Sequence, residues 1–240
     1  MTLTLSVEGV GRTHVGLVRR RNEDSYHVGH ALLAVADGLG GHVAGDVASA
    51  TVIDAIRPHD NEVERGALSA VLGRAVRDAN DALRKRTEAE PALAGMGSTL
   101  VAMLCAGPTA VVANVGDSRA YLLRDSRLVR ITEDHTFGHL VADAARVPNL
   151  PERLSRFLDG RPDGRSPDLT TWNLRLGDRF LLCSDGLSSY VAPQAIFSAL
   201  KSSKSRDEAA DRLISLAIDR GGPDNVTVIV IDVLVEGDQN

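Results

Sequence analysis

The stretch LLAVADGLGGH, residues 32–42, runs from apolar residues directly into an aspartate and then into glycines. Leu32–Ala36 is the kind of continuous apolar run that forms a buried strand, and the glycines permit a sharp turn that a side chain would obstruct. Asp37 would then be held at the end of a rigid strand. Its carboxylate is a hard oxygen ligand for a divalent cation, and the Gly38 carbonyl is a neighbouring one. Because Asp-Gly is also an ordinary turn signal, this stretch alone favours a turn.

The same arrangement recurs three times, with an aspartate where an apolar strand-like run meets a glycine-containing turn: Asp117 after ANVG, Asp185 after FLLCS and Asp224 after GGP. Positions of this kind gather at one end of stacked sheets, so we expect the four acids to lie together. Each acid alone could be a turn residue or a cap. Four acids in near-identical settings favour a shared site instead.

Clustered carboxylates repel one another unless positive charge compensates them. Divalent cations supply that charge, and oxygen ligands without His or Cys suit Mg²⁺ or Mn²⁺ better than Zn²⁺. Two such ions about 3.5–4 Å apart can bind one bridging water, lower its pKa and present it to a phosphorus atom. The acids therefore predict hydrolytic phosphoryl chemistry at a dinuclear metal site.

Length and composition favour a single soluble domain that covers residues 1–240. No stretch resembles a linker, and the formal net charge of −5 argues against nucleic acid as a partner. No signal peptide is recognisable, and the longest apolar segment, Val226–Val235, is broken by Asp232 and too short to span a bilayer. Cys105 and Cys183 lie in apolar runs, which predicts buried free thiols. We therefore expect a cytoplasmic protein with no membrane partner.

The order of the expected elements favours an α+β fold. Helices and strands come in blocks and do not alternate, which predicts antiparallel sheets rather than a doubly wound parallel one. Strands are expected at residues 2–16 (with a turn), 26–28, 31–36, 97–106, 109–115, 119–124, 128–132, 169–172, 179–184 and 226–234. Helices are expected at residues 45–58, 61–88, 193–200 and 207–220. Residues 137–158 carry only a weak helical pattern, and residues 160–167 are typical of a polar loop.

Seven segments resemble, in order, the motifs of the bacterial metal-dependent Ser/Thr protein phosphatases of type 2C. They extend from about residue 11 to residue 232 and read VGLVRRRNEDSY, VADGLGGHVAGDVAS, GMGSTLVA, VANVGDSRAYLLR, ITEDHT, GDRFLLCSDGL and GGPDNVTVIVI. The resemblance implies a central β-sandwich of two antiparallel sheets flanked on both sides by α-helices, with a dinuclear Mn²⁺ or Mg²⁺ site at one end. It also implies hydrolysis of phosphoserine and phosphothreonine by direct attack of water that the two ions activate.

The resemblance assigns the acids to particular ions. Asp37 would bridge two core metals, and Gly38 would contribute its carbonyl oxygen to one of them. Asp185 and Asp224 would complete the shell of the other core ion. Asp117, together with Asp185, would bind a third and weaker ion.

Two residues upstream of these acids also match the family motif. Arg19 would contact the substrate phosphate, which a guanidinium can grip with two hydrogen bonds. For any one of Arg19, Arg20 and Arg21 a solvated surface charge is the plain alternative, and the position in the motif singles out Arg19. Glu23 would act through a metal-bound water.

Four departures from the family pattern bear on this site. The chain has His14 where many relatives have Asp, which could alter the approach to Arg19, and Leu39 where they have Met. Residues 136–165 match poorly the mobile flap that touches substrate in relatives, and they are shorter. His42 could relay a proton to the leaving alcohol. Eukaryotic relatives carry that histidine at the position of Leu39, so a supporting role for His42 is favoured.

These observations predict a metal-dependent phosphatase whose partners are phosphorylated Ser/Thr proteins, substrates of a Ser/Thr kinase. Two alternatives stay open: a catalytically weak member of the same fold that binds phosphoproteins or a partner kinase, and a phosphatase for small molecules. A cysteine nucleophile finds no support, because neither Cys105 nor Cys183 lies in a phosphate-binding loop. No oligomeric state is predicted.

Overall fold

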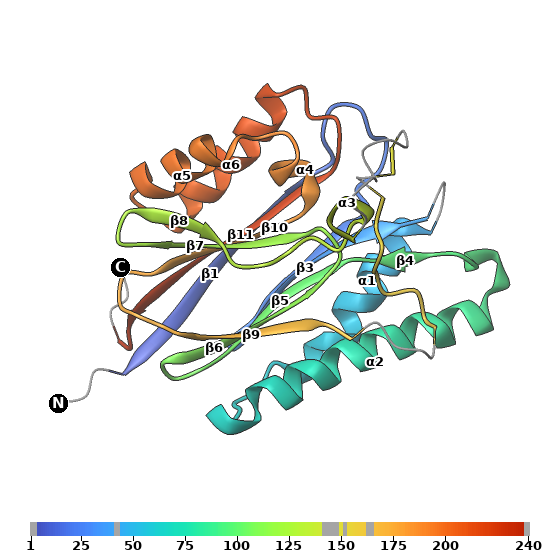
Figure 1. Ribbon diagram of the computed structural model, residues 1–240, viewed down its shortest axis with the longest axis horizontal. Helices are drawn as coiled ribbons and strands as arrows, with labels where there is room; N and C mark the ends of the chain where they lie inside the picture. Colours follow the sequence, from blue (N-terminus) through green and yellow to red (C-terminus); the bar gives the residue numbers. More distant parts are fainter. Residues whose placement is uncertain (1–3, 41–43, 141–148, 151–152, 162–165, 238–240) are drawn as a thin grey trace.

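Two antiparallel sheets pack face to face at the centre of the protein, and helices cover the outer face of each sheet (Figure 1). The computed structural model describes residues 4–40, 44–140, 149–150, 153–161 and 166–237. This architecture confirms the expected α+β sandwich with helices on both sides.

The first sheet has five strands. Their spatial order is β1 (Leu5–His14), β11 (Val226–Val235), β10 (Arg179–Cys183), β7 (Arg119–Arg124) and β8 (Arg127–Arg130). Its outer face packs against three helices: α4 (Asp185–Ser188), α5 (Pro193–Ser202) and α6 (Arg206–Asp219).

The second sheet is built from strands that are mostly central in the sequence. Their order is β2 (Asp24–Val28), β3 (Leu32–Leu39), β5 (Leu100–Ala106), β6 (Thr109–Val115) and β9 (Asp168–Asn173), and the short β4 (Gly97–Ser98) pairs with the end of β3. Helices α1 (Gly45–Ile56) and α2 (Leu68–Ala89) cover its outer face. The other helical segments are the 3-10 turns Arg57–His59, Arg65–Ala67 and Pro91–Leu93 and the one-turn helix α3 (Phe137–Leu140).

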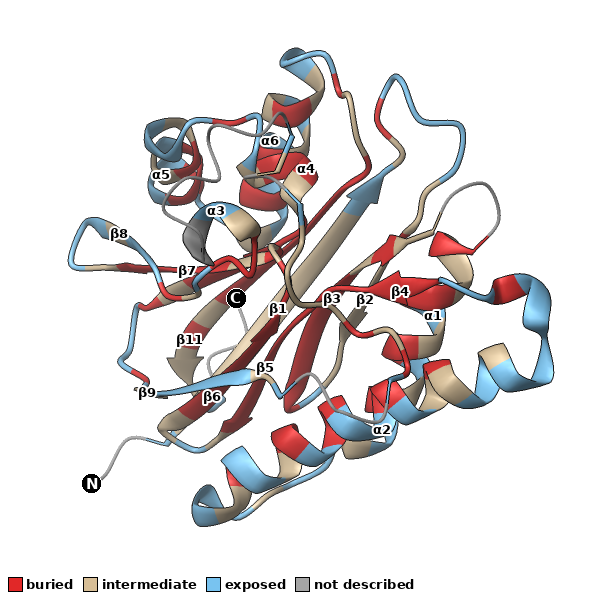
Figure 2. Ribbon diagram, turned by 45° about the vertical axis from the view of Figure 1, so that its right-hand side comes forward, coloured by how far each residue is buried: buried red, intermediate tan, exposed pale blue. Residues whose placement is uncertain are grey.

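Continuous apolar runs mark the central strands because both of their faces are buried. In β3, Leu33 and Val35 point into the core between the sheets, whereas Leu32 and Ala34 pack against the helices. This is the two-residue period of a strand. Figure 2 shows that the central strands are buried along most of their length. The large side chain of Phe180 is fully buried in the core between the sheets.

Strand β3 is longer than predicted, and this changes the role of its glycine. The strand continues to Leu39, so Asp37 lies within it rather than at its end. Gly38 pairs with β4, and its N–H donates to the carbonyl of Glu23 (3.0 Å). A Cβ at Gly38 would lie 1.9 Å from the carbonyl oxygen of Gly45. Glycine is therefore needed here for a close approach of two backbones, and not for a turn.

Helix α2 begins at Leu68 instead of residue 61. Glu64 has an extended backbone, and a 3-10 turn with Gly66 at its centre follows it. The helix starts only where the buried apolar stripe starts, since that stripe supplies most of its stability; the stripe is Leu68, Leu72, Ala75, Val76, Ala79 and Leu83. Helix α4 was not predicted, and the strand expected at 97–106 is divided into β4 and β5. The remaining predicted helices and strands are present within a few residues of their expected ranges. The weakly patterned residues 137–158 include α3, and part of the loop 160–167 lies outside the described residues.

Both cysteines are free and buried, as predicted. Burial raises the pKa of Cys105 and of Cys183 to about 12. Neither thiol is therefore ionised to a nucleophile at neutral pH. Among the helices that the structure describes, none is long and apolar enough to cross a membrane.

Candidate functional site

A pocket of about 560 Å³ brings most of the predicted site residues together. Its wall includes Arg19, Glu23, Asp37, Gly38, Asp117, Asp185 and Asp224. The pocket lies at the end of the sandwich that β4 and α4 mark, opposite the end where β1 begins and β11 ends (Figure 1). His42 lies outside the described residues, so its role stays a prediction.

Backbone hydrogen bonds hold Asp37 in place. The residue stands opposite Asp24 in the register of β2 and β3. Its N–H donates to Thr99 Oγ1 (3.0 Å), and its carbonyl accepts from Thr99 N (2.8 Å) and from Ser98 Oγ (3.0 Å). With its backbone fixed on both sides, Asp37 presents its carboxylate to the pocket from a constant position.

The other three acids lie near the ends of strands and helices that meet at the same end of the sandwich. Asp117 is in the turn between β6 and β7, Asp185 is the first residue of α4, and Asp224 lies two residues before the start of β11. The segments of Asp185 and Asp224 touch: a Cβ at Gly186 would lie 1.8 Å from the carbonyl oxygen of Asn225. Only glycine allows this approach, so the glycine after the acid brings two acid-bearing segments together.

Asn225 organises the loop between β1 and β2. Its Nδ2 donates to the carbonyl oxygens of Val15 (2.9 Å) and Arg21 (2.8 Å), and its Oδ1 accepts from Glu23 N (2.8 Å). The sequence analysis missed this residue. Its place directly after Asp224, within a motif, was the available signal.

His14 also shapes the loop that leads to Arg19. Its Nδ1 accepts a hydrogen bond from Gly16 N (2.9 Å). Gly16 has a φ of +82°, and a Cβ there would lie 2.3 Å from the carbonyl oxygen of Asp224. The histidine therefore helps to set the path of the chain against the turn that carries Asp224.

Part of the poorly matched segment 136–165 forms one wall of the pocket. Arg153, Leu154 and Phe157 line it. Leu158 is fully buried and exchanges two backbone hydrogen bonds of 2.9 Å with Ser98 in β4. The sequence analysis placed substrate contact in this segment but named none of these residues. The predicted shortening of the segment lies partly outside the described residues.

Burial dominates the electrostatics of the acids. It raises the pKa of Asp37 well above its ordinary value, and the neighbouring carboxylates, that of Asp24 foremost, raise it further. Burial raises the pKa of Asp117 to about 7, with Asp185 contributing. The pKa of Asp185 is raised for the same reason, and the charge of Asp224 adds to the effect. The pocket thus gathers negative charge that its surroundings do not neutralise.

Asp24 is a fifth acid of this cluster, which the sequence analysis did not single out. It is only 8% exposed, and its Oδ2 accepts a hydrogen bond from Ser184 Oγ (2.7 Å). Its Oδ1 is buried and has no hydrogen-bond partner among the described residues. Burial raises the pKa of Asp24 to about 7. Its place directly after Glu23, within the first motif, was the available signal in the sequence.

Arg19 is the cation that faces the acids. Its Nη2 lies 2.7 Å from Asp224 Oδ2, and Asp224 Oδ1 accepts a hydrogen bond from Asn225 N (2.8 Å). Asp224 is thus engaged with its neighbours. Within the described ranges, no three or more His, Cys, Asp or Glu side chains stand in an arrangement that would hold a metal ion.

The chemistry of the donor set nevertheless fits Mg²⁺ or Mn²⁺. The side-chain donors are carboxylates and the backbone donor at Gly38 is a carbonyl, all hard oxygens. The Oδ1 of Asp24 is buried without a hydrogen-bond partner among the described residues, and burial among carboxylates raises the pKa of Asp37. A bound cation would stabilise the charged form of both carboxylates. At Asp224, the guanidinium of Arg19 would share or compete for the carboxylate with a bound ion.

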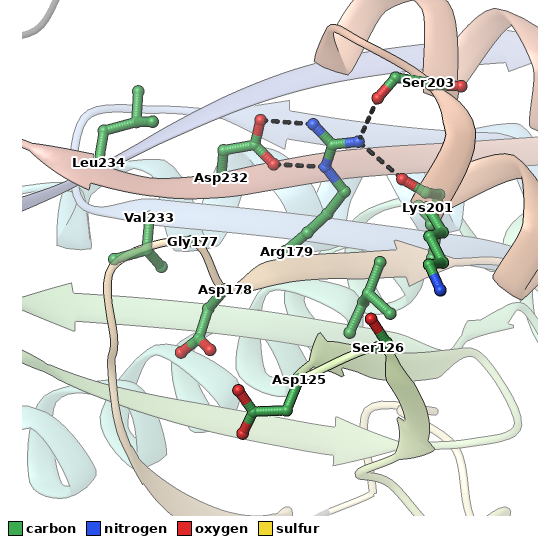
Figure 3. Close-up of a pocket in the computed structure, with 12 residues that line it drawn as sticks. Asp125, Ser126, Gly177, Asp178, Arg179, Lys201, Ser203, Asp232, Val233 and Leu234 are labelled. Atoms are coloured by element: carbon green, nitrogen blue, oxygen red, sulfur yellow. Dashed lines mark hydrogen bonds and ion pairs between the residues drawn. The ribbon is translucent and has the colours of Figure 1, made fainter.

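A second pocket, of about 360 Å³, lies where β10 begins and β11 ends in the first sheet, and it differs in character (Figure 3). Its charged groups neutralise one another. Arg179 Nε and Nη2 donate to the two carboxylate oxygens of Asp232 (2.6 and 2.8 Å), and Arg179 Nη1 donates to the carbonyls of Leu200 and Ser203. Such a fully paired arginine supports the sheet and is not a candidate for chemistry.

A β-sandwich with buried acids clustered at one end is typical of a known class of protein. The family model of protein phosphatase 2C matches residues 10–217. The chain belongs to the protein phosphatase 2C family, which confirms the resemblance found in the sequence.

Individual relatives agree with this assignment. The chain is 46% identical over 239 residues to the serine/threonine protein phosphatase PstP of Mycobacterium tuberculosis, with 97% of this chain covered. It spans 46% of that relative's length, less than half. It is 35% identical to the serine/threonine phosphatase stp of Listeria welshimeri, covering 92% of this chain and 94% of the relative.

Solved structures resemble this one closely. The catalytic domain of PstP in complex with two manganese ions matches with a TM-score of 0.88 at 47% identity, covering 96% of this chain and 100% of that chain. A bacterial serine phosphatase matches with a TM-score of 0.86 at 32% identity, covering 98% of this chain and 100% of that chain.

The raised pKa of Asp24 predicts a pH-dependent stability of the protein after treatment with a chelator. The pKa is about 7 in the folded state and 3.8 ordinarily, so between these values the folded state binds more protons than the unfolded state. The free energy of unfolding should therefore fall as the pH rises through this window and level off above it. Asp24→Asn should reduce the fall, measured by urea unfolding at pH ~5 and ~7.5.

The control is Asp54→Asn in α1, whose side chain is 72% exposed. This variant should keep the pH dependence of the unsubstituted protein. The same dependence in Asp24→Asn would show that Asp24 ionises at its ordinary pKa.

Proposed function

We propose that this chain is a metal-dependent protein phosphatase that hydrolyses phosphoserine and phosphothreonine without a covalent intermediate. The observation that carries the proposal is the cluster of buried, raised-pKa carboxylates around one pocket, with the guanidinium of Arg19 paired to one of them, on a protein phosphatase 2C fold. A site that is rich in carboxylates repels a phosphate unless cations are bound between them. The function thus depends on Mn²⁺ or Mg²⁺.

We assign two core ions to four residues. Asp37, held within β3, would contact both ions, and the Gly38 carbonyl would complete one shell while Asp185 and Asp224 complete the other. Asp117, beside Asp185, would hold a third and weaker ion. The manganese complex of PstP supports the number of core ions. When bound, such ions neutralise charge on the phosphate and lower the pKa of a coordinated water.

Arg19 would bind the substrate phosphate. Its side chain is 51% exposed and its guanidinium is held 2.7 Å from Asp224. With an ion held at Asp224, the guanidinium would be available to make charge-assisted hydrogen bonds to an anion. The same loop places Glu23 against Gly45, at a distance that leaves no room for a side chain there. We assign Glu23 to holding a water of the site.

The biological setting is part of the proposal. We infer that the protein opposes a Ser/Thr kinase in signalling in the cytoplasm. Two buried free thiols, Cys105 and Cys183, support a reducing compartment. The net charge of −5 supports protein rather than nucleic acid as the partner.

The direct test is a panel of phosphoserine and phosphothreonine peptides together with p-nitrophenyl phosphate. Turnover should require added Mn²⁺ or Mg²⁺ and should disappear with EDTA, because the proposed ligands are hard oxygens. Full turnover by the metal-stripped protein would contradict the proposal. Turnover of p-nitrophenyl phosphate and small metabolites alone would indicate a small-molecule phosphatase, and binding of phosphopeptides without turnover would indicate a regulatory protein.

The assignment of the ions predicts a ranking of the acids. Asp37→Asn should abolish tight metal binding and leave the protein close to inactive, because this residue is proposed to contact both core ions. Asp185→Asn should be nearly as harmful. Asp117→Asn should keep both core ions and lose turnover by a smaller margin. Isothermal titration calorimetry with Mn²⁺ measures the first effect. Loss of tight binding in Asp117→Asn with retention in Asp37→Asn would reverse the assignment.

The role of Arg19 predicts a difference among three neighbouring arginines. Arg19→Ala should lower kcat/KM by roughly ten- to a hundredfold, since a charge-assisted hydrogen bond contributes about 1.5–3 kcal/mol. Mn²⁺ affinity should not fall, because the substitution frees Asp224 from its ion pair. Arg20→Ala and Arg21→Ala are matched controls and should have little effect. Equal losses at all three positions would indicate a diffuse basic patch.

A further inference from the structure

A groove of about 680 Å³ runs between strand β8 and helix α5 on the outer face of the first sheet. In Figure 1, β8 lies at the border of this sheet and α5 lies directly beside it. The floor of the groove is apolar and includes Tyr121, Leu128, Pro193 and Phe197. None of these four residues lines the acid pocket.

The charge of this groove is opposite to that of the protein as a whole. Its lining contains Arg119, Arg127 and Arg130 and no carboxylate, although the chain has a net charge of −5. Arg119 and Arg130 share the single buried counterion Asp134, at 2.6 and 3.3 Å. No ion pair of Arg127 is found among the described residues. Lys201, whose Nζ lies 5.3 Å from the centroid of the Phe197 ring, adds another positive charge nearby.

Strand β8 is an edge strand whose outer side is open. It is the last strand in the order of its sheet, and among the described residues no strand pairs with its outer side. Val129 at its centre is 51% exposed. Edge strands with unpaired backbone groups can accept an extended peptide as an additional strand, and their side chains then select its sequence.

The groove is connected to the acid pocket through Arg119. This residue follows Asp117 by two positions, and its Nη1 donates to the carbonyl of Ser188 (3.2 Å), the last residue of α4. Helix α4 begins with Asp185. A chain bound along β8 would therefore run beside Arg119, which is two positions from Asp117 and hydrogen-bonded to the helix that Asp185 begins.

We propose that the groove between β8 and α5 binds an extended segment of the phosphoprotein substrate, rich in acidic residues that alternate with apolar ones. This inference rests on the proposed function and adds a determinant of substrate choice. On one face of the added strand, acidic side chains would lie beside Arg127, and on the other face apolar side chains would lie against Leu128 and Phe197. The four residues of β8 offer a pairing length of about 13 Å.

The catalytic test compares two phosphopeptides that share the same phosphorylated core. One carries an extension of alternating Glu and Val, and the other carries Gly and Ser. Arg127→Glu should lower kcat/KM for the acidic peptide by about five- to tenfold, mainly through KM, because it reverses a charge at the rim. It should leave p-nitrophenyl phosphate and the Gly-Ser peptide unchanged. Arg74→Glu, the same charge change at an exposed position of α2, is the matched control.

Direct binding tests the groove even if the proposed function fails. A fluorescein-labelled, unphosphorylated Glu-Val peptide should bind the full chain, measured by anisotropy, and binding should weaken about five- to tenfold in Arg127→Glu but not in Arg74→Glu. Methylation of alternate backbone nitrogens of the peptide should also weaken binding, because β-pairing needs those N–H groups.

Three results would overturn the inference. One is equal binding of the Glu-Val and Gly-Ser peptides, and another is an Arg74→Glu effect as large as that of Arg127→Glu. The third is binding to phosphatidylserine vesicles that depends on Arg127 while the acidic peptide does not bind. If no phosphoester is hydrolysed but the peptide binds as expected, the proposed function fails and the groove stands as a site for acidic chains.

Discussion

Burial of carboxylates that are gathered at one end of a β-sandwich is the constraint on which this protein is built, and their mutual repulsion adds to it. Asp24, Asp37, Asp117 and Asp185 come from separate parts of the chain, and burial raises the pKa of each. Holding such groups together without compensating charge costs free energy. The rest of the structure must supply that free energy through packing, and the acids in turn create a place for divalent cations.

The sandwich meets this demand with three separate apolar layers. One lies between the sheets, and the others lie between each sheet and its helices. Close backbone contacts at Gly38 and Gly186 then lock the acid-bearing segments to the helices and to each other. Hydrogen bonds from Thr99 to Asp37 and from Asn225 to the β1–β2 loop remove the remaining freedom. The acids cannot move apart to relieve their repulsion, so they stay available to an ion.

Charge is divided between two surfaces of the protein. The pocket concentrates carboxylates, and the groove beside β8 concentrates arginines, with Arg119 lying between the two. Burial of Asp134 between Arg119 and Arg130 uses one carboxylate to hold two cations in place. A phosphorylated chain is itself anionic, so a positive groove leading to a cation-dependent pocket suits the approach of such a chain.

Much of the fold and of the acid cluster was predictable from the sequence, because the signals are local. An apolar run beside an aspartate and a glycine identifies Asp37, Asp117, Asp185 and Asp224 wherever they lie in space, and the order of helical and strand patterns identifies an α+β fold. The four acids were expected to lie together because the ends of strands meet at the end of a sandwich. Their roles toward metal ions stay predictions.

The other features of the site and of the groove depend on tertiary contacts and could not be predicted from the sequence. Asp24 becomes part of the cluster because Ser184, which lies far away in the sequence, bonds to it, and because Asp37 stands opposite it in the paired strand β3. Glycine is required at position 38 because α1 begins directly against it. Arg19 pairs with Asp224 because the β1–β2 loop lies against the turn before β11. The basic groove exists only because β8 is left at the edge of its sheet beside α5. Local patterns report which residues can form a strand or a turn, whereas burial, pairing and charge balance depend on which distant segments are brought into contact.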